Sequence, residues 1–347
     1  MSLRLGAGTN PMEPRKQEIL KAVVDEFTVT AVPVGSAALV SRHSVRLSAA
    51  TVRNELSELV ELGYLVQPHT SAGRMPSDQG YRYFVDFLMS APPPGPGVDA
   101  YIEGELRQVP ADAQSLVERL ATVIAAVTQS AAVVTAPHGS LARIKHLDLV
   151  ALEPAEVLVV VVVEGNLIRQ HVIRVSRPTD QAELSRLAAK INRDLLGRDR
   201  DEVRLRLGRA PGTLERELLE RLGEILELFE RGAGTMVVHD GVRNLLKQPE
   251  FADAARLQKV LEVLEETRHL AALLQELVGA SDMQIVIGSE NRQEQLRSCT
   301  VILTTYGPSQ QVKGVLGVVG PTRMDYGATV GRLHAVARRA SERMAEA

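Results

Sequence analysis

The sequence predicts an α+β protein built from several domains. Its 347 residues exceed what one ordinary hydrophobic core supports, which indicates two or three domains. Short helical patterns and a Gly-bounded hairpin occupy residues 15–90, whereas strand-like runs flank a helix-rich block in the remainder. Apolar residues make up 45% of the chain, which is enough for globular cores. Aromatic residues make up only 3% and Trp is absent, so those cores must be mainly aliphatic.

Residues 1–14 are expected to form a flexible leader, because they lack both a helical pattern and an apolar signal segment. Residues 15–29 then place apolar side chains at helical spacing. Gly35 and Ser36 open a short helix that runs through His43, with Ser36 as its expected N-cap. Ser48 is the N-cap of a longer helix over 49–62, which Gly63 ends.

A strand at 64–67 and the turn PHTSAG complete a hairpin directly after this helix. Two helices joined by a tight connection and followed by such a hairpin form a winged helix-turn-helix. This shape fits the major groove of duplex DNA, so residues 15–90 are predicted to be a DNA-binding domain.

The longer helix has an apolar face and an opposite polar face. At about 100° per residue, its apolar side chains share one side and Asn54 points away from them. Ala50 and Thr51 flank Asn54 in the first turns, and Arg53 lies to the side. Asn can pair bidentately with adenine and a Thr methyl group can pack on thymine, whereas Arg53 suits a phosphate. The alternative is that Asn54 is merely solvated and that Arg53 pairs with Glu55 or Glu58.

The charge pattern supports a DNA-facing surface although the net charge of the chain is −3. No acidic residue occurs between Glu26 and Glu55 or between Glu61 and Asp78. These two windows contain the short helix, the start of the long helix and the hairpin, the parts that would face phosphate. The predicted DNA contacts are Ser36, Arg42, Arg46, Ser48, Ala50, Thr51, Arg53, Asn54, His69, Thr70, Ser71 and Arg74.

Beyond the hairpin, Ser77 is expected to cap a helix whose aromatic side chains pack the first domain onto the next. Residues 91–98, rich in Pro and Gly, are predicted to be a linker. Strand patterns follow at 144–152, 157–163 and 167–175, and three more occur at 283–287, 300–306 and 312–319. Because a helix-rich block lies between the two sets, one sheet interrupted by an insertion is expected. Two apolar helix stripes in this part of the chain suggest a dimer interface, with packing against the chain's own sheet as the alternative.

Several longer strings match a known family. They are PVGS at 33–36, SAATVRNEL at 48–56, GYLVQPHTSAGRMPSDQGYRYFVD at 63–86, GSEN at 288–291 and VVGPTRMDY at 318–326. Through them the chain closely resembles the heat-inducible transcription repressor family (HrcA). The family commonly has Ile and Met where this chain has Val52 and Leu56. Both positions lie on the core face, so these differences concern stability more than the choice of operator.

The resemblance implies a repressor of chaperone operons that binds an inverted-repeat operator as a homodimer, with a chaperonin modulating its activity and heat stress abolishing it. It also implies a GAF-like antiparallel sheet domain, assigned to 99–175 and 250–347, and an inserted helix-rich dimerisation domain at 176–249. The alternative is a metabolite-gated winged-helix regulator with an effector site in the GAF-like domain.

Other classes of function find little support in the sequence. The longest apolar run, 157–163, is too short for a membrane span, and the single cysteine indicates a reduced, cytoplasmic setting. His69 has no partner at metal-ligand spacing, and Asp240, Glu290 and Asp325 lack a positioned nucleophile or base. The GxxGxxG spacing at 314–320 lies in a strand and is no dinucleotide fingerprint, so no cofactor, metal or enzymatic activity is expected. In GPTRMDY, the side chains of Arg323 and Asp325 are expected to pair locally.

Overall fold

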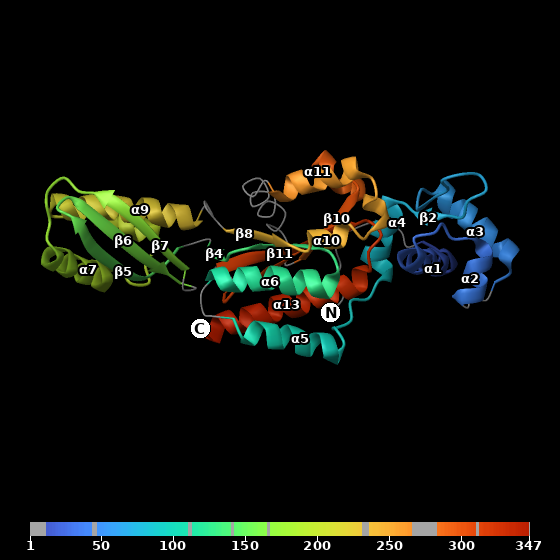
Figure 1. Cartoon of the computed structure of the whole chain (residues 1–347), viewed down its shortest axis with the longest axis horizontal. Coiled ribbons are helices and arrows are strands. Elements are labelled where there is room, and N and C mark those ends of the chain that lie inside the picture. The colour runs from blue at the N-terminus through green and yellow to red at the C-terminus, as the bar shows by residue number, and fades with distance from the viewer. Residues whose placement is uncertain are drawn as a thin grey trace.

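The computed structural model describes residues 12–43, 47–109, 113–139, 142–164, 167–230, 236–265, 283–309 and 312–346. Helices and antiparallel sheets are mixed along the chain, which confirms the predicted α+β class. Three parts follow one another in an elongated arrangement, with the N-terminal helices at one end and β5–β7 at the other (Figure 1). None of the helices in these ranges combines the length and the apolar character that crossing a bilayer requires.

The N-terminal unit consists of three helices and a two-stranded hairpin. Its elements are α1 (Pro14–Thr30), α2 (Ser36–Arg42), α3 (Ala49–Glu61), β1 (Leu65–Val66) and β2 (Met75–Pro76). The predicted apolar face of α3 is confirmed, because Val52, Leu56 and Leu59 are buried against α1 and α2. Ser48 is the N-cap of α3 as expected. Gly35 is the N-cap of α2, however, and Ser36 is its first residue and makes no capping bond, so the prediction for Ser36 was wrong.

Two short helical segments, α4 (Asp78–Tyr83) and the π-helix η1 (Phe84–Leu88), connect this unit to the body. Ser77 caps α4 as predicted, since its Oγ accepts a hydrogen bond from Gly80 N at 3.0 Å. Tyr81, Tyr83 and Phe84 are buried between the two parts as expected, whereas Phe87 is 51% exposed. A single apolar core runs through both parts. The predicted linker at 91–98 is shorter in the structure, because α5 begins at Pro96 with its proline in the first turn, where a missing N–H costs nothing.

The central sheet has the strand order β8-β3-β11-β10-β9, with β4 paired to the start of β11. Its strands are β3 (Ala131–Thr135), β4 (His138–Gly139), β8 (Val237–Asp240), β9 (Met283–Ile287), β10 (Cys299–Tyr306) and β11 (Val312–Pro321). One face packs on α6 (Ala113–Thr128) and α13 (Tyr326–Glu346), and α5 (Pro96–Arg107) packs on these two helices, farther from the sheet (Figure 1). The other face packs on α10 (Val242–Leu245), η2 (Pro249–Phe251) and α11 (Ala254–Glu265). The short turns η3 (Gly288–Glu290) and η4 (Glu294–Leu296) join β9 to β10. A helical pattern in the sequence from Phe251 to Val278 predicts one long helix; α11 begins at Ala254, and residues 266–278 lie outside the described residues.

The strands at 144–174 form a separate sheet, so the expectation that they share one sheet with the C-terminal strands was wrong. They are β5 (Ile144–Glu153), β6 (Glu156–Val163) and β7 (Leu167–Arg174), paired in that order by short turns. Their buried face is covered by α7 (Gln181–Leu195), α8 (Arg200–Leu207) and α9 (Thr213–Glu230), with which they share a core of their own. The apolar stripe of α9 is buried in that core, which favours the intrachain alternative for it. We therefore propose that the insertion spans about residues 142–230 rather than 176–249.

Candidate nucleic-acid interface

The N-terminal half of α3 presents a small polar surface to solvent. Ala50, Arg53 and Asn54 are exposed and Thr51 is half-buried, while the opposite side of the helix lies in the core. Ser48 holds the start of the helix, because its Oγ accepts a hydrogen bond from Thr51 N at 3.1 Å. The same Oγ lies 2.9 Å from Thr51 Oγ1, so the two hydroxyl groups are hydrogen-bonded to each other at the start of the helix. This end carries the positive part of the helix dipole, which suits a phosphate.

Two acidic side chains of α3, Glu55 and Glu58, are neutralised by α1. Glu55 Oε1 lies 3.4 Å from Arg15 Nη1, and Lys16 Nζ lies 3.2 Å from Glu55 Oε2 and 2.9 Å from Glu58 Oε2. Hydrogen bonds to Glu58, Glu13 and Glu55 raise the pKa of Lys16 above its usual value, so its charge persists in the ordinary pH range. The two carboxylates of α3 nearest its exposed N-terminal surface are therefore paired, while Glu61 is exposed at the far end of the helix.

Arg53 and Asn54 keep their side chains available. The expected competitors of Arg53, Glu55 and Glu58, are paired with Arg15 and Lys16 instead. Across the described ranges, no side-chain hydrogen bond or ion pair engages Arg53 or Asn54. An exposed, unpaired Arg next to an exposed Asn on a capped helix end offers donors for phosphate and for base edges.

Arg42 behaves differently from the prediction, although it lies in the basic window. Its Nη1 is hydrogen-bonded to Glu26 Oε1, and His43 Nε2 lies 3.0 Å from Glu26 Oε2. The hydrogen bond from His43, with further help from Arg42, lowers the pKa of the Glu26 carboxyl. These contacts tie α2 to α1, so Arg42 is not a free cation. Ser36 is half-buried in the first turn of α2, and Arg46 lies outside the described residues.

The hairpin tip is held in shape by Gln67, whose role the sequence did not reveal. Its Nε2 donates to Thr70 O at 2.8 Å and to Ala72 O at 3.1 Å, and Ala72 N donates to His69 O at 2.8 Å. The tip is therefore an ordered turn, and His69, Thr70 and Ser71 are exposed on it. Their side chains are placed where a groove or a phosphate could meet them.

Arg74 lies at the base of the hairpin and is half-buried. Its backbone exchanges two hydrogen bonds with Val34, at 2.7 and 2.8 Å, which fastens the hairpin to the segment before α2. Its Nη1 donates to Ala72 O at 3.2 Å, while its Nε is buried without a hydrogen-bond partner. Gly73 is required beside it, since a Cβ there would lie 2.5 Å from Pro33 O. Arg74 thus supports the hairpin, which is a different role from the free phosphate contact that was expected.

The acids weighed as catalytic candidates have structural partners. Asp240 Oδ2 accepts a hydrogen bond from Thr122 Oγ1 at 2.7 Å, Glu290 pairs with Arg82, and Asp325 Oδ1 accepts from Ala328 N at 2.9 Å. The expected local pair of Arg323 and Asp325 was wrong, because Arg323 pairs with Glu250. Among the residues that the structure describes, no three His, Cys, Asp or Glu side chains gather as a metal site requires.

Comparison with known proteins shows which family the chain is similar to. A family model described as the HrcA protein C-terminal domain matches residues 114–330. A protein of Roseiflexus castenholzii named heat-inducible transcription repressor HrcA is 36% identical over 345 residues, which are 97% of this chain and 96% of that protein. A Chloroflexus aurantiacus protein of the same name is 34% identical over 346 residues, covering 95% of this chain and 93% of the relative. A crystal structure described as that of a hypothetical protein shares the fold, with a TM-score of 0.60 and 21% identity over 97% of this chain and 98% of the other.

By class, these relatives are transcription repressors. The chain belongs to the HrcA family, and the resemblance found in its motifs is thereby confirmed. The name of these relatives also describes a heat-inducible repressor, as the resemblance in the sequence motifs implied.

Proposed function

We propose that the N-terminal unit is a winged helix-turn-helix that binds a specific duplex DNA operator. The observation that carries the proposal is the surface of α3, where Arg53 and Asn54 are exposed and unpaired in the described residues while α1 neutralises Glu55 and Glu58. A capped helix whose N-terminal half carries an unpaired Arg and no carboxylate is suited to the major groove.

Individual roles follow from position on this surface. Asn54 reads a base edge, with Ala50 and Thr51 beside it as apolar contacts to thymine methyl groups. Arg53 contacts phosphate and sets the register of the helix on the duplex. The exposed hairpin tip at 69–71 contacts the backbone or the minor groove, and Arg74 keeps that tip in place.

We propose that the chain acts as a homodimer on an inverted-repeat operator. The outer face of the β5–β7 sheet supports this proposal, because it carries apolar side chains that the chain itself leaves uncovered. Val150, Leu152, Ile168 and Val172 are 36%, 50%, 61% and 57% exposed, and Leu158 lies half-buried between Val150 and Val172 in one row across the sheet. An exposed apolar patch of this kind marks an interaction surface, and two copies related by a two-fold axis can cover it reciprocally.

The regulation we propose follows the names of the relatives, which are heat-inducible repressors. Heat stress lowers operator occupancy by populating a state that does not bind, and a chaperonin restores the binding-competent state. In the same proposal the central sheet with α5, α6 and α13 is the GAF-like domain, and the regulated genes are chaperone operons. A purified protein whose operator complex persists far above growth temperature, unaffected by chaperonin, would contradict this regulation.

Selection of bound duplexes from a random pool by the purified full chain tests the DNA-binding function. The expected result is a recovered inverted repeat whose two halves are related by a two-fold axis. Recovery of a single unrepeated site would contradict the dimer, and recovery of no sequence preference would contradict the operator function itself.

One observation favours the alternative of a metabolite-gated regulator. A cavity of about 870 Å³ lies between η1, the residues after it and α13, with Phe87, Met89 and Val330 among its apolar lining residues. Its volume is in the range that holds small molecules. A screen of metabolites for a rise in the melting temperature discriminates the two, since a specific ligand that raises it and changes operator affinity would favour effector control.

A further inference from the structure

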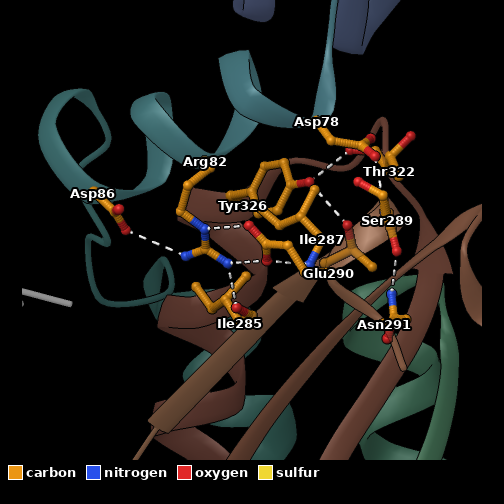
Figure 2. A network of polar contacts seen from close by, with 12 residues as sticks. Asp78, Arg82, Asp86, Ile285, Ile287, Ser289, Glu290, Asn291, Thr322 and Tyr326 are labelled. Carbon is orange, nitrogen blue, oxygen red and sulfur yellow. Dashed lines mark hydrogen bonds and ion pairs between the residues drawn. The ribbon is translucent and has the colours of Figure 1, made fainter. Parts of the chain in front are cut away.

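The motif GSEN, at residues 288–291, forms a polar clamp on α4, which connects the N-terminal unit to the body. Arg82 of α4 reaches across to Glu290, with Nε 2.8 Å from Oε1 and Nη2 2.5 Å from Oε2 (Figure 2). Its Nη2 also donates to the carbonyl oxygen of Ile285 at 2.5 Å. Burial alone would lower the pKa of Arg82, but the hydrogen bond and the charge of Glu290 outweigh burial and raise this pKa. The two parallel hydrogen bonds between Arg82 and Glu290 fix both the distance and the angle between α4 and the central sheet.

A second contact lies beside this pair. Asp78 Oδ2 accepts a hydrogen bond from Ser289 N at 2.8 Å (Figure 2). Gly288 has a φ of +51°, and a Cβ at this position would lie 2.3 Å from the Asp78 carboxyl group. A Cβ at this position would therefore push the Asp78 carboxyl off Ser289 N, and the positive φ itself favours glycine.

The motif GPTRMDY supplies a second clamp, through Arg323. Its Nη1 donates to Thr28 O at 2.6 Å, and its Nε donates to Glu250 Oε1 at 2.5 Å. Thr28 lies in the last turn of α1, where carbonyl groups lack a helical partner and attract a cation. Arg323 therefore holds the end of α1 on the body.

The linker itself is seated on the body as well. A Cβ on Gly327 would lie 2.4 Å from Ser90 O, and one on Gly331 would lie 2.0 Å from Pro92 O. These two glycines are one turn apart on α13, so the backbone of residues 90–92 lies directly against α13 where a Cβ would clash. The N-terminal unit is consequently not a freely tethered domain.

The clamps are connected to α3 through α1. Arg323 fixes one end of α1, and Lys16 near its other end bridges to Glu55 and Glu58 of α3. A rotation of α1 on the body would therefore carry the proposed DNA-contact helix with it.

We propose that this joint, meaning the Arg82–Glu290 clamp, the Arg323–Glu250–Thr28 clamp and the seated linker, determines which half-site spacing the repressor accepts. The proposal rests on the DNA-binding function proposed above. In a dimer, two α3 helices enter successive grooves only if each is held at a fixed angle to its body. Without the joint, each helix unit would bind its half-site independently, and the preference for one spacing would be lost.

The variants Arg82→Gln, Arg323→Gln and Gly288→Ala open the joint by different means, the first two by removing charge and the third by steric exclusion. Arg221→Gln is the matched control, because Arg221 forms an exposed ion pair with Glu224 in the insertion, at 2.6 Å. Circular dichroism checks the fold of each variant.

The first measurement uses fluorescence anisotropy with the operator, with versions whose spacer is changed by about half a helical turn, roughly five base pairs, and with a single half-site. Wild type and Arg221→Gln are expected to discriminate between spacings. The joint variants should lose at least about tenfold of that discrimination, as expected when two sites are no longer presented together. Their affinity for the single half-site should stay within about twofold of wild type.

The second measurement needs no DNA. Spin labels on cysteines introduced at the exposed positions Glu61 of α3 and Glu262 of α11, in chains diluted with unlabelled protein, report the distance between unit and body. A narrow distribution in wild type that broadens in the joint variants supports the proposal, and an unchanged distribution overturns it. If the variants keep the spacing preference, the proposed role of the joint is wrong, and the proposed DNA binding is unaffected. If wild type binds no half-site at all, the proposed function is wrong and the spacing claim falls with it.

Discussion

Replacing Asn54 with alanine separates base reading from folding on the proposed interface. The side chain is exposed on the N-terminal half of α3, and no hydrogen bond in the described residues engages it. Truncation therefore removes no internal contact, and the free energy of unfolding should change by less than about 0.5 kcal/mol. A bidentate Asn–adenine pair contributes about 1–3 kcal/mol of discrimination, so each half-site should lose about 5- to 150-fold in affinity.

Anisotropy titrations with operator and with random duplex at one salt concentration measure this loss. Binding to random DNA should stay nearly unchanged, because it depends on phosphate contacts. Gln114→Ala is the control, since Gln114 is an exposed amide on α6, far along the chain from the interface. Equal losses on both duplexes, or no loss on the operator, would refute direct reading by Asn54.

Four further predictions concern the same molecule. Arg53→Gln should lower the slope of log affinity against log salt by about one unit, and an unchanged slope would argue against a phosphate contact. Ser48→Ala should lower the free energy of unfolding by about 1 kcal/mol in urea titrations, because Thr51 N loses its acceptor, and an unchanged midpoint would contradict the cap. Since the hydrogen bond from His43 lowers the pKa of Glu26 below 4.5, wild type should gain thermal stability over Glu26→Gln above pH 4.5 and lose that advantage on acidification, so a constant difference in melting temperature would count against it. Burial raises the pKa of Cys299 to about 12, so a thiol reagent at about pH 8 should label only the unfolded chain, and rapid labelling of the native protein would show the site to be open.

Local patterns predicted the local structure of the N-terminal unit well. The N-cap Ser48 and the buried face of α3 follow from helical spacing and from the preference of Ser for helix ends, which depend on neighbours in sequence. The same reasoning misplaced the cap of α2 by one residue, because Gly35 and Ser36 are both acceptable at that position.

Pairing between distant residues could not be predicted in the same way. Whether Arg53 is free depends on Arg15 and Lys16, which the fold brings to Glu55 and Glu58; Arg15 lies 40 residues before Glu55. Nothing in the sequence distinguished Arg42 from Arg53, yet Arg42 forms an ion pair with Glu26 in the structure. A charge pattern shows which cations exist, whereas only the packing of α1 against α2 and α3 decides which of them have partners.

The sheet assignment shows the same limit at a larger scale. Alternation in 157–163 identifies a strand with one buried face, but it does not say which strands pair with it. The short turns around β6 let 144–174 pair as a meander, and the apolar stripes of α7 and α9 cover that sheet within the insertion. The apolar stripe of α9, which the sequence suggested as a dimer surface, is buried by this packing. The sequence pattern did not indicate that the outer face of the sheet would stay uncovered.

The most direct test of the proposed DNA-binding surface is photo-crosslinking from α3 to an operator. A photoreactive amino acid at position 54 should crosslink to bases within each half-site, and the same group at position 114 should crosslink to none. Crosslinks of equal yield from both positions would contradict the placement of α3 in the major groove. The same conclusion would follow if the probe at position 54 formed no crosslink while the protein was fully bound to the operator.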